Sequence, residues 1–207
     1  MMDALILAFD RAARTLSGAA ISRRAYPAGD GGAQSTLTDD ERRQSISLMR
    51  VNHAGEVAAQ ALYQGQAVFS RDPVLREKLG AAADEELDHL AWTRQRIVEL
   101  GGRTSVFDPL WYAGSFAIGA AAAALGDKTS LGFLQATEEQ VEAHLQSHLG
   151  ELPANDAASR KIVETMKADE AQHAETAREL GAPVLSALTH SVMRRASKVM
   201  TTLSAKL

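Results

Sequence analysis

The chain of 207 residues contains no cysteine, which excludes a disulfide framework, a thiolate metal site and an iron–sulfur cluster. Aromatic residues make up only 5% of the chain. The net charge of −4 gives no electrostatic case for binding nucleic acid. The most apolar stretch, Trp111 to Leu125, is shorter than the about 20 residues that a membrane-spanning helix needs. Metal ligands in this chain must therefore be oxygen and nitrogen atoms.

Two Glu-x-x-His motifs stand out, and each follows a single glutamate by about thirty residues. The six candidate ligands are Glu56, Glu86, His89, Glu138, Glu170 and His173. Residues three apart on a helix share a face, so each motif presents both side chains to one core. A four-helix bundle that holds two metal ions uses this ligand set. Two of its helices each supply one glutamate, and the other two each supply a Glu-x-x-His motif.

The spacing brings the ligands to one height. Glu56 lies 16 residues before Asp72 and Glu86 lies 14 after it, and Pro73 favours a helix break there. At a helix rise of ~1.5 Å per residue, the chain runs roughly 24 Å from Glu56 to the break and roughly 21 Å back to Glu86. The second half repeats the pattern about Pro153, at 15 and 17 residues. We therefore expect two helical hairpins that each bring three ligands to the same level.

The donor set leaves iron, manganese or zinc as candidates, with iron favoured and manganese next. A single Glu-x-x-His is most often a solvated pair on a helix surface. Here both motifs have an upstream glutamate at a matched distance, and this joint pattern favours a metal centre.

The periodicity predicts an all-α fold: a four-helix bundle with an inserted apolar helix and amphipathic terminal helices. Seven helical segments are expected, at residues 3–18, 38–70, 73–100, 109–125, 128–149, 155–180 and 183–205. Thr38 and Glu41 form a capping-box pattern at the start of the second segment. Residues 25–36 read as a flexible linker. We thus expect an N-terminal segment and linker at 1–36 and a helical domain at 37–207.

The apolar stretch has two interpretations, a buried core helix or an interfacial helix that dips into lipid with Trp111 at the headgroup level. Both ends of the chain are amphipathic and basic, as at Arg23–Arg24 and Arg194–Arg195. Such segments suit an anionic membrane surface or a partner helix. No secretory signal is expected, because the first apolar run is short and holds Asp3 and Asp10. We expect a protein bound peripherally to the cytoplasmic face of the cell membrane.

Four strings together resemble the demethoxyubiquinone hydroxylases, the carboxylate di-iron monooxygenases of ubiquinone biosynthesis. They are Arg50-Val-Asn-His-Ala-Gly-Glu56, Glu86-x-x-His89, Phe107-Asp-Pro-Leu-Trp111 and Asp169-Glu-Ala-Gln-His173. The resemblance runs from about residue 40 to the C-terminus. It implies a ferritin-like fold and makes the six candidate ligands the ligands of two iron ions, with Glu138 rather than Glu139 in the third motif.

The resemblance also implies a reaction and its participants. The enzyme would hydroxylate the ring of a prenylated demethoxyubiquinone with O2, and NADH or reduced quinone would supply electrons. A homo-oligomer or an accessory lipid-binding protein is a possible partner. Two other classes of function stay open. One is a ferritin-like di-iron oxidase or iron-storage protein, and the other is a non-catalytic helical bundle in which the metal ions only stabilise the fold.

Three further residues are candidates for a supporting role. His144, on the helix of Glu138, either hydrogen-bonds a ligand carboxylate or assists proton transfer, or is an ordinary packed or surface histidine. Tyr63 shares the face of Glu56 and either hydrogen-bonds near the metals or is a structural tyrosine. His53 has the same two interpretations.

The remaining candidates are assigned no ligand role. His148 and His190 are expected at the surface. Glu85, Glu139 and Glu142 are expected to be solvated or to support the ligands from outside.

Overall fold

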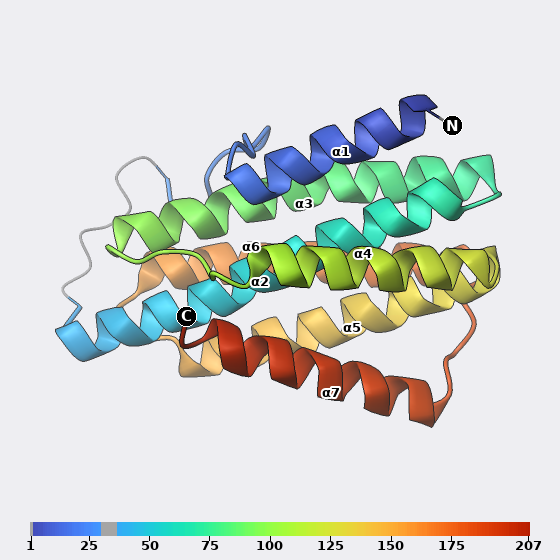
Figure 1. Cartoon of the computed structure of the whole chain (residues 1–207). Helices are drawn as coiled ribbons and strands as arrows, with labels where there is room; N and C mark the ends of the chain where they lie inside the picture. Colours follow the sequence, from blue (N-terminus) through green and yellow to red (C-terminus); the bar gives the residue numbers. More distant parts are fainter. Residues whose placement is uncertain (1, 30–36) are drawn as a thin grey trace.

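The computed structural model describes residues 2–29 and 37–207, with side chains from residue 9 onward. These residues form seven α-helices and no strand (Figure 1). The helices are α1 Met2–Ser17, α2 Asp39–Phe69, α3 Pro73–Glu99, α4 Asp108–Ala124, α5 Asp127–Glu151, α6 Ala157–Glu179 and α7 Ala187–Ser204. The all-α class and the seven predicted segments are confirmed. Residues 30–36 of the expected linker lie outside the described residues, and the division at residue 36 stays a prediction.

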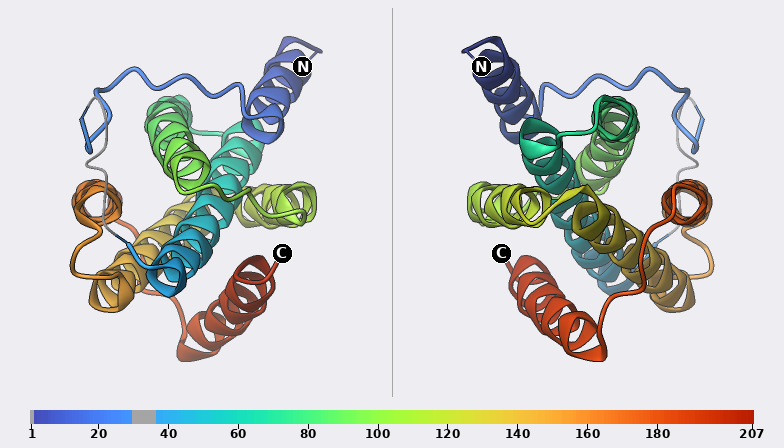
Figure 2. Two further views of the ribbon diagram at one scale, coloured as in Figure 1. Left: turned by 90° about the vertical axis from the view of Figure 1, so that its left-hand side faces the viewer. Right: turned by 90° about the vertical axis from the view of Figure 1, so that its right-hand side faces the viewer.

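Two helical hairpins make up a four-helix bundle. α2 pairs with α3, α5 pairs with α6, and the two hairpins meet through α3 with α6 and α2 with α5. The end views in Figure 2 show α2 at the centre of the molecule, with α4 and α7 outside the bundle. α4 lies between the two hairpins in the chain and packs against α2, while α7 contacts α2 and α5.

Local signals set where the helices begin and end. Thr38 Oγ1 accepts a hydrogen bond from the Glu41 amide at 3.3 Å, and Glu41 Oε2 accepts one from the Thr38 amide at 2.8 Å, which confirms the capping box. Asp72 accepts from the Val74 amide at 2.8 Å and begins α3 beside Pro73. Because the Asp72 cap sets where the turn between α2 and α3 ends, it helps to set the relative height of the residues on the two arms.

Two apolar layers lie along the bundle. One holds Met49, Trp92, Leu145 and Met166, and the other holds Tyr63, Leu79, Leu131 and Ala177. On each of the four bundle helices, the candidate ligands fall in the sequence between a residue of one layer and a residue of the other. The polar site is therefore enclosed by packed apolar side chains on both sides.

α4 is neither a fully buried core helix nor a helix that lies outside the packed protein. Its inner face meets α2 so closely that a Cβ on Gly65 would overlap the Phe116 carbonyl oxygen, and a Cβ on Gly119 would overlap that of Leu62. Its outer face exposes Ile118 and other apolar residues. Within residues 2–29 and 37–207, no helix is long and apolar enough to cross a membrane.

Candidate metal centre

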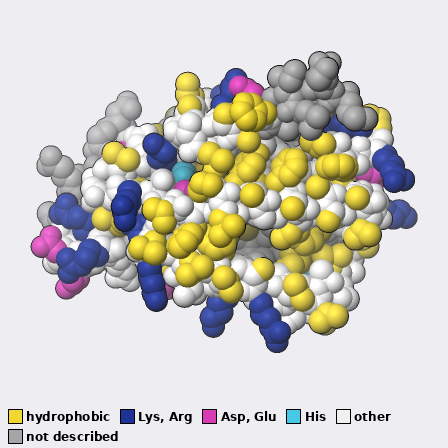
Figure 3. Space-filling model, in the orientation of Figure 1, with side chains coloured by type: hydrophobic (Ala, Val, Ile, Leu, Met, Phe, Trp, Pro, Cys, Tyr) yellow, Lys and Arg dark blue, Asp and Glu magenta, His cyan; other side chains and the backbone are white. Residues whose placement is uncertain are grey.

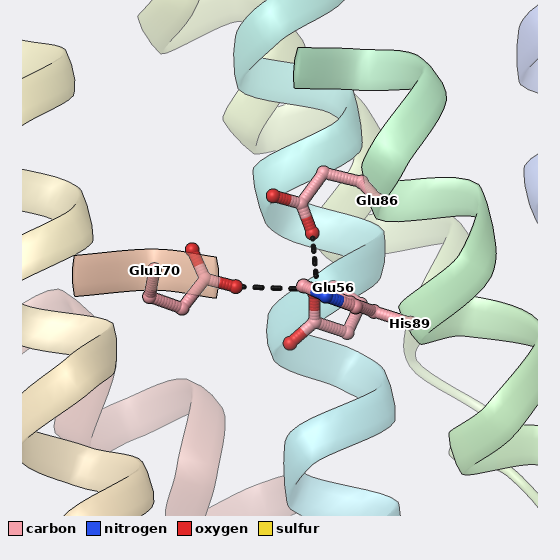
Figure 4. Close-up of side chains that lie close together, drawn as sticks. All are labelled: Glu56, Glu86, His89 and Glu170. Carbon is pink, nitrogen blue, oxygen red and sulfur yellow. Dashed lines mark hydrogen bonds and ion pairs between the residues drawn. The ribbon is translucent and has the colours of Figure 1, made fainter. Parts of the chain in front are cut away.

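The six candidate ligands converge from four helices on one level of the bundle. α2 supplies Glu56, α3 supplies Glu86 and His89, α5 supplies Glu138, and α6 supplies Glu170 and His173. All four carboxylates and His89 are at most 2% exposed, and the His173 side chain is 10% exposed. Figure 4 shows the Glu56, Glu86 and Glu170 carboxylates around the His89 ring. The expected convergence of the two hairpins is thus present in the structure.

The six side chains form two overlapping groups, each with its ligand atoms within 4.8 Å of one another. One group is Glu56, Glu86, His89 and Glu170, and the other is Glu86, Glu138, Glu170 and His173. The two groups share the Glu86 and Glu170 carboxylates. Such an arrangement fits two adjacent cations, each with one carboxylate and one imidazole of its own and two carboxylates in common.

The hydrogen bonding of these side chains is incomplete. Among the described residues, several buried ligand atoms have no hydrogen-bond partner: Glu56 Oε2, Glu86 Oε1, Glu138 Oε2, both Glu170 carboxylate oxygens and His173 Nδ1. Buried polar groups are costly unless they are hydrogen-bonded or coordinate a metal. These unpartnered atoms therefore fit a pair of bound divalent cations.

Both imidazoles turn the same nitrogen toward the carboxylates. His89 Nδ1 lies 3.2 Å from Glu86 Oε2 and 3.2 Å from Glu170 Oε1. His173 Nδ1 lies 3.5 Å from Glu170 Oε2 and 3.6 Å from Glu86 Oε1. Nδ1 is therefore the atom that each histidine would offer to a metal ion.

The other imidazole nitrogen is bound by an acidic residue in both cases. His89 Nε2 lies 3.0 Å from Asp169 Oδ2, and His173 Nε2 lies 3.0 Å from Glu85 Oε2. A carboxylate at Nε2 keeps the proton on that nitrogen and leaves the Nδ1 lone pair for a metal. Asp169 was missed at the sequence level, whereas Glu85 was expected to be solvated or supporting. The available signal was that an acidic residue directly precedes the glutamate of both motifs.

Charge at the centre is balanced by protons in the metal-free protein. Burial, then the nearby Glu86 carboxylate, raises the pKa of Glu56 well above its ordinary value. Burial and Glu170 do the same to the pKa of Glu138. Burial opposes ionisation of Glu170 too, but the nearby imidazoles of His173 and His89 hold its pKa below the ordinary value. Metal binding would displace these protons, so metal affinity should depend on pH.

Tyr63 is fully buried beside the centre, and its hydroxyl donates a short hydrogen bond to Glu138 Oε1. Burial and the Glu138 carboxylate raise the pKa of Tyr63 well above its ordinary value, so the hydroxyl keeps its proton. The side chain also belongs to one of the apolar layers. Tyr63 therefore both hydrogen-bonds a candidate ligand and packs as a structural tyrosine.

His144 contacts no ligand carboxylate by a hydrogen bond. Its Nε2 has no hydrogen-bond partner among the described residues, and its ring packs on His148 with centroids 4.0 Å apart. Burial lowers the pKa of His144, which keeps the ring neutral near pH 7. His144 lines a cleft between α2, α5 and α7 that reaches Glu56. A role in proton transfer stays a prediction.

Two other histidines lie away from the centre. His148 was expected at the surface, and this was wrong: it is 5% exposed, and its Nδ1 lies 2.7 Å from Asn52 Oδ1. His53 is also buried, with its Nδ1 3.0 Å from Thr93 Oγ1. Since its side chain contacts Thr93 and Asp108 and no candidate ligand by a hydrogen bond, His53 fits the packed interpretation. His190 is half-buried on α7.

Comparison with known proteins gives one consistent result. The family model described as "Ubiquinone biosynthesis protein COQ7" matches residues 43–204. The chain is 57% identical over 203 residues to the 3-demethoxyubiquinol 3-hydroxylase of Variovorax paradoxus, covering 98% of this chain and 97% of the relative. It is 56% identical over 201 residues to the enzyme of that name from Chromobacterium violaceum, covering 97% of each. The same name belongs to a relative from an Azoarcus species, 54% identical over 202 residues and 98% of each chain.

Proposed function

The chain belongs to the COQ7 family of ubiquinone biosynthesis proteins, and from this we propose that it is an O2-dependent 3-demethoxyubiquinol hydroxylase with two iron ions. The observation that carries the proposal is the pair of overlapping ligand groups that share Glu86 and Glu170. A centre for two adjacent metal ions suits a reaction that must deliver electrons to O2 in pairs. Overall, a ring C–H becomes C–OH, the second oxygen atom leaves as water, and a donor supplies two electrons and two protons.

The six converging side chains would hold the iron ions, Glu56 and His89 on one, Glu138 and His173 on the other, and Glu86 and Glu170 on both. Iron bound there would supply the reversible redox chemistry that lets O2 be reduced beside the ring. NADH or reduced quinone is the donor we propose. Manganese binds the same ligand types, but the family assignment favours iron.

The protein itself orients and shields this chemistry. Asp169 and Glu85 fix the two imidazoles with Nδ1 toward the carboxylates. Tyr63 fixes Glu138 through its hydroxyl proton. The apolar layers on both sides exclude water, which strengthens electrostatic interactions inside the bundle.

A route for the substrate ring is available beside Glu56. The cleft between α2, α5 and α7 has a volume of about 40 Å³ and is lined by Glu56, His144 and Thr201, among others. A planar ring would need more room, so α7 would have to move outward. Ser204 is the one buried residue of α7, so few packed side chains oppose this movement. We propose that neutral His144 accepts a proton from a quinol hydroxyl in this cleft.

We further propose that the protein binds the cytoplasmic surface of the cell membrane through α4 and α7. We call the exposed apolar residues of these helices the apolar face: Leu110, Ile118, Leu125, Leu188, Val192, Val199 and Leu203. Figure 3 shows hydrophobic side chains gathered over α4 and α7, with Lys and Arg side chains along the lower edge. α7 also carries exposed Arg194, Arg195 and Lys198.

An apolar face flanked by basic residues suits an anionic membrane, where a prenylated quinol would reside. A second copy of the chain or a lipid-binding protein would be an alternative occupant of this face.

Oxygen uptake tests the proposed reaction against iron storage. In a hydroxylase, uptake by iron-loaded protein continues as long as quinol and reductant are present and scales with the quinol consumed. In a storage protein, uptake stops once the added iron is oxidised and does not respond to quinol. Uptake that follows iron alone would overturn the proposal.

Flotation with anionic vesicles tests the membrane proposal. An Ile118→Glu, Leu125→Glu variant places two charges on the apolar face, and we expect it to lose most vesicle binding. A Val74→Glu, Val98→Glu variant adds the same charge at two exposed valines of α3 and should bind as the unaltered protein does. Equal binding by both variants would remove α4 from the membrane contact.

A further inference from the structure

A second polar site lies at the end of the molecule where α2 begins and α7 ends. We call it the arginine pocket: a hollow of about 480 Å³ lined by Arg43, Arg50 and Arg103, with Ser47, the Gly101–Gly102 turn and Ala205. Figure 3 shows Lys and Arg side chains at this end, the left side of the view, with Asp and Glu side chains beside them. No aspartate or glutamate side chain lines the hollow. The site does not involve any candidate metal ligand.

The guanidinium of Arg50 is held in place by backbone oxygens. Its Nε donates to the Arg103 carbonyl at 2.8 Å, and its Nη1 donates to the Ala205 carbonyl at 3.3 Å. Ser47 Oγ donates to the same Ala205 carbonyl at 3.0 Å. Neutral carbonyls orient the guanidinium without cancelling its charge, so Arg50 is ordered and keeps an uncompensated positive charge.

Several other arginines of the described chain are paired with carboxylates instead. Arg24 and Arg96 each contact an aspartate carboxylate, at 2.6 and 2.8 Å. In the described part of the chain, neither Arg50 nor Arg103 has a carboxylate within 4.0 Å. At the rim of the hollow, Arg43 contacts Asp40, an exposed neighbour on its own helix.

The positive charge of Arg103 acts on Arg50. Partial burial, then the positive charge of Arg103, lowers the pKa of Arg50. Like charges repel, and an anion bound between them would relieve the repulsion. The turn behind them is closely packed, because a Cβ on Gly102 would meet Ile46 Cγ2 at 2.6 Å.

We propose that the arginine pocket binds a phosphate group. Guanidinium groups match phosphate oxygens in geometry and charge, and two of them can bind from two sides. The pocket adjoins the apolar face, since the Val106 amide donates to the backbone oxygen of Leu207 at 2.8 Å and Trp111 Nε1 donates to Ser204 Oγ at 3.0 Å. These contacts join the pocket wall to α4 and α7. A phospholipid headgroup can therefore enter the pocket while its acyl chains lie against the apolar face. A soluble phosphate ligand has the same chemistry and is the other source.

Two binding measurements on the full chain test the proposal and separate the sources. The first is co-sedimentation with vesicles of phosphatidylcholine and phosphatidylglycerol, and the second is calorimetric titration with inorganic pyrophosphate. The pocket variant is Arg50→Gln, Arg103→Gln. The control is Arg42→Gln, Arg71→Gln, which removes the same charge at two exposed arginines that do not line the pocket.

We expect the pocket variant to bind its ligand roughly tenfold more weakly and the control to change much less. A loss confined to vesicles identifies the phospholipid headgroup, and a loss in the pyrophosphate titration identifies a soluble phosphate. Equal losses in the pocket and control variants, or no loss in either measurement, would overturn the proposal. Arg103→Gln alone covers the case in which loss of Arg50 disturbs folding, because the Arg103 side chain is exposed. Neither measurement depends on iron or on hydroxylation.

Discussion

His89 and Asp169 are bound to each other across the two hairpins, with Nε2 and Oδ2 3.0 Å apart. The second motif mirrors this contact, because His173 Nε2 lies 3.0 Å from Glu85 on the other hairpin. Each Glu-x-x-His motif therefore receives its supporting carboxylate from the residue that precedes the glutamate of the other motif. This crossed pairing ties α3 to α6 at the level of the ligands.

An Asp169→Asn substitution should weaken metal binding. The amide removes the charge at Nε2 and no longer fixes the orientation of His89, and changes of this kind typically cost about 10–100-fold in metal affinity. Asp169 also pairs with Arg24, so Arg24→Gln serves as the control that breaks this ion pair and spares His89. Competition with a metal chelator gives the affinities. The crossed pairing would have no role in metal binding if both variants matched the unaltered protein.

A Tyr63→Phe substitution should destabilise the metal-free protein. The phenyl ring preserves the packing, but Glu138 Oε1 loses the hydroxyl that donates to it. A buried acceptor without its partner costs about 1–3 kcal/mol. Urea denaturation of the chelator-treated protein measures the loss. An unchanged unfolding free energy would mean that water or another group replaces the hydroxyl.

The spacing of the ligands explains why so much of the site could be predicted. The rise of a helix and the three-residue spacing of a motif determine positions within a single hairpin. Glu56 and Glu86 could therefore be placed at one height from the sequence alone. The crossed pairing could not, because it depends on how two hairpins rotate against each other. His148 was misplaced although Glu138, Leu145 and His148 recur at helical spacing on one face of α5, and this periodicity was the signal to follow.

The position of α4 was also beyond the sequence, for a different reason. Its uncharged composition suits a core helix and an interfacial helix equally. Which face is covered depends on the close approach of Gly119 to α2, a contact between residues far apart in the chain. Because α4 consists largely of alanine, glycine and other uncharged residues, the hydrophobicity of its two faces differs too little for the sequence pattern to identify the covered face.

A Gly65→Ala substitution should disrupt the packing of α4 on α2. The added methyl would overlap the Phe116 carbonyl, and overpacking of this kind costs about 1–3 kcal/mol. Gly114→Ala on α4 is the matched control, because no atom lies within 4 Å of its Cβ and alanine favours a helix by about 0.5–1 kcal/mol. Thermal unfolding followed by circular dichroism should show a lower Tm for the first variant and an equal or higher Tm for the second. Equal stability of both variants would contradict the close contact.

Acid should destabilise the protein partly through His148. Burial, then the neighbouring His144, lowers the pKa of His148 to about 3, whereas the unfolded chain takes up this proton near pH 6.5. Below pH 6.5 the unfolded state therefore binds a proton that the folded state does not, and stability falls by up to about 1.4 kcal/mol per pH unit. A His148→Gln variant should show a shallower loss of unfolding free energy between pH 6.5 and pH 5 in urea titrations. Parallel pH profiles would show that His148 is protonated in the folded protein.

The most direct test of the two-metal hydroxylase is product analysis after a single exposure to oxygen. Protein loaded anaerobically with Fe(II) is mixed with a short-tailed 3-demethoxyubiquinol and NADH, exposed to ¹⁸O-labelled O2, and the quinone is analysed by mass spectrometry. The account predicts a ring product that has gained one labelled oxygen atom, and its absence in a Glu170→Ala variant, which removes a carboxylate shared by both ligand groups. Oxidation of the iron with the quinone left unchanged would contradict it.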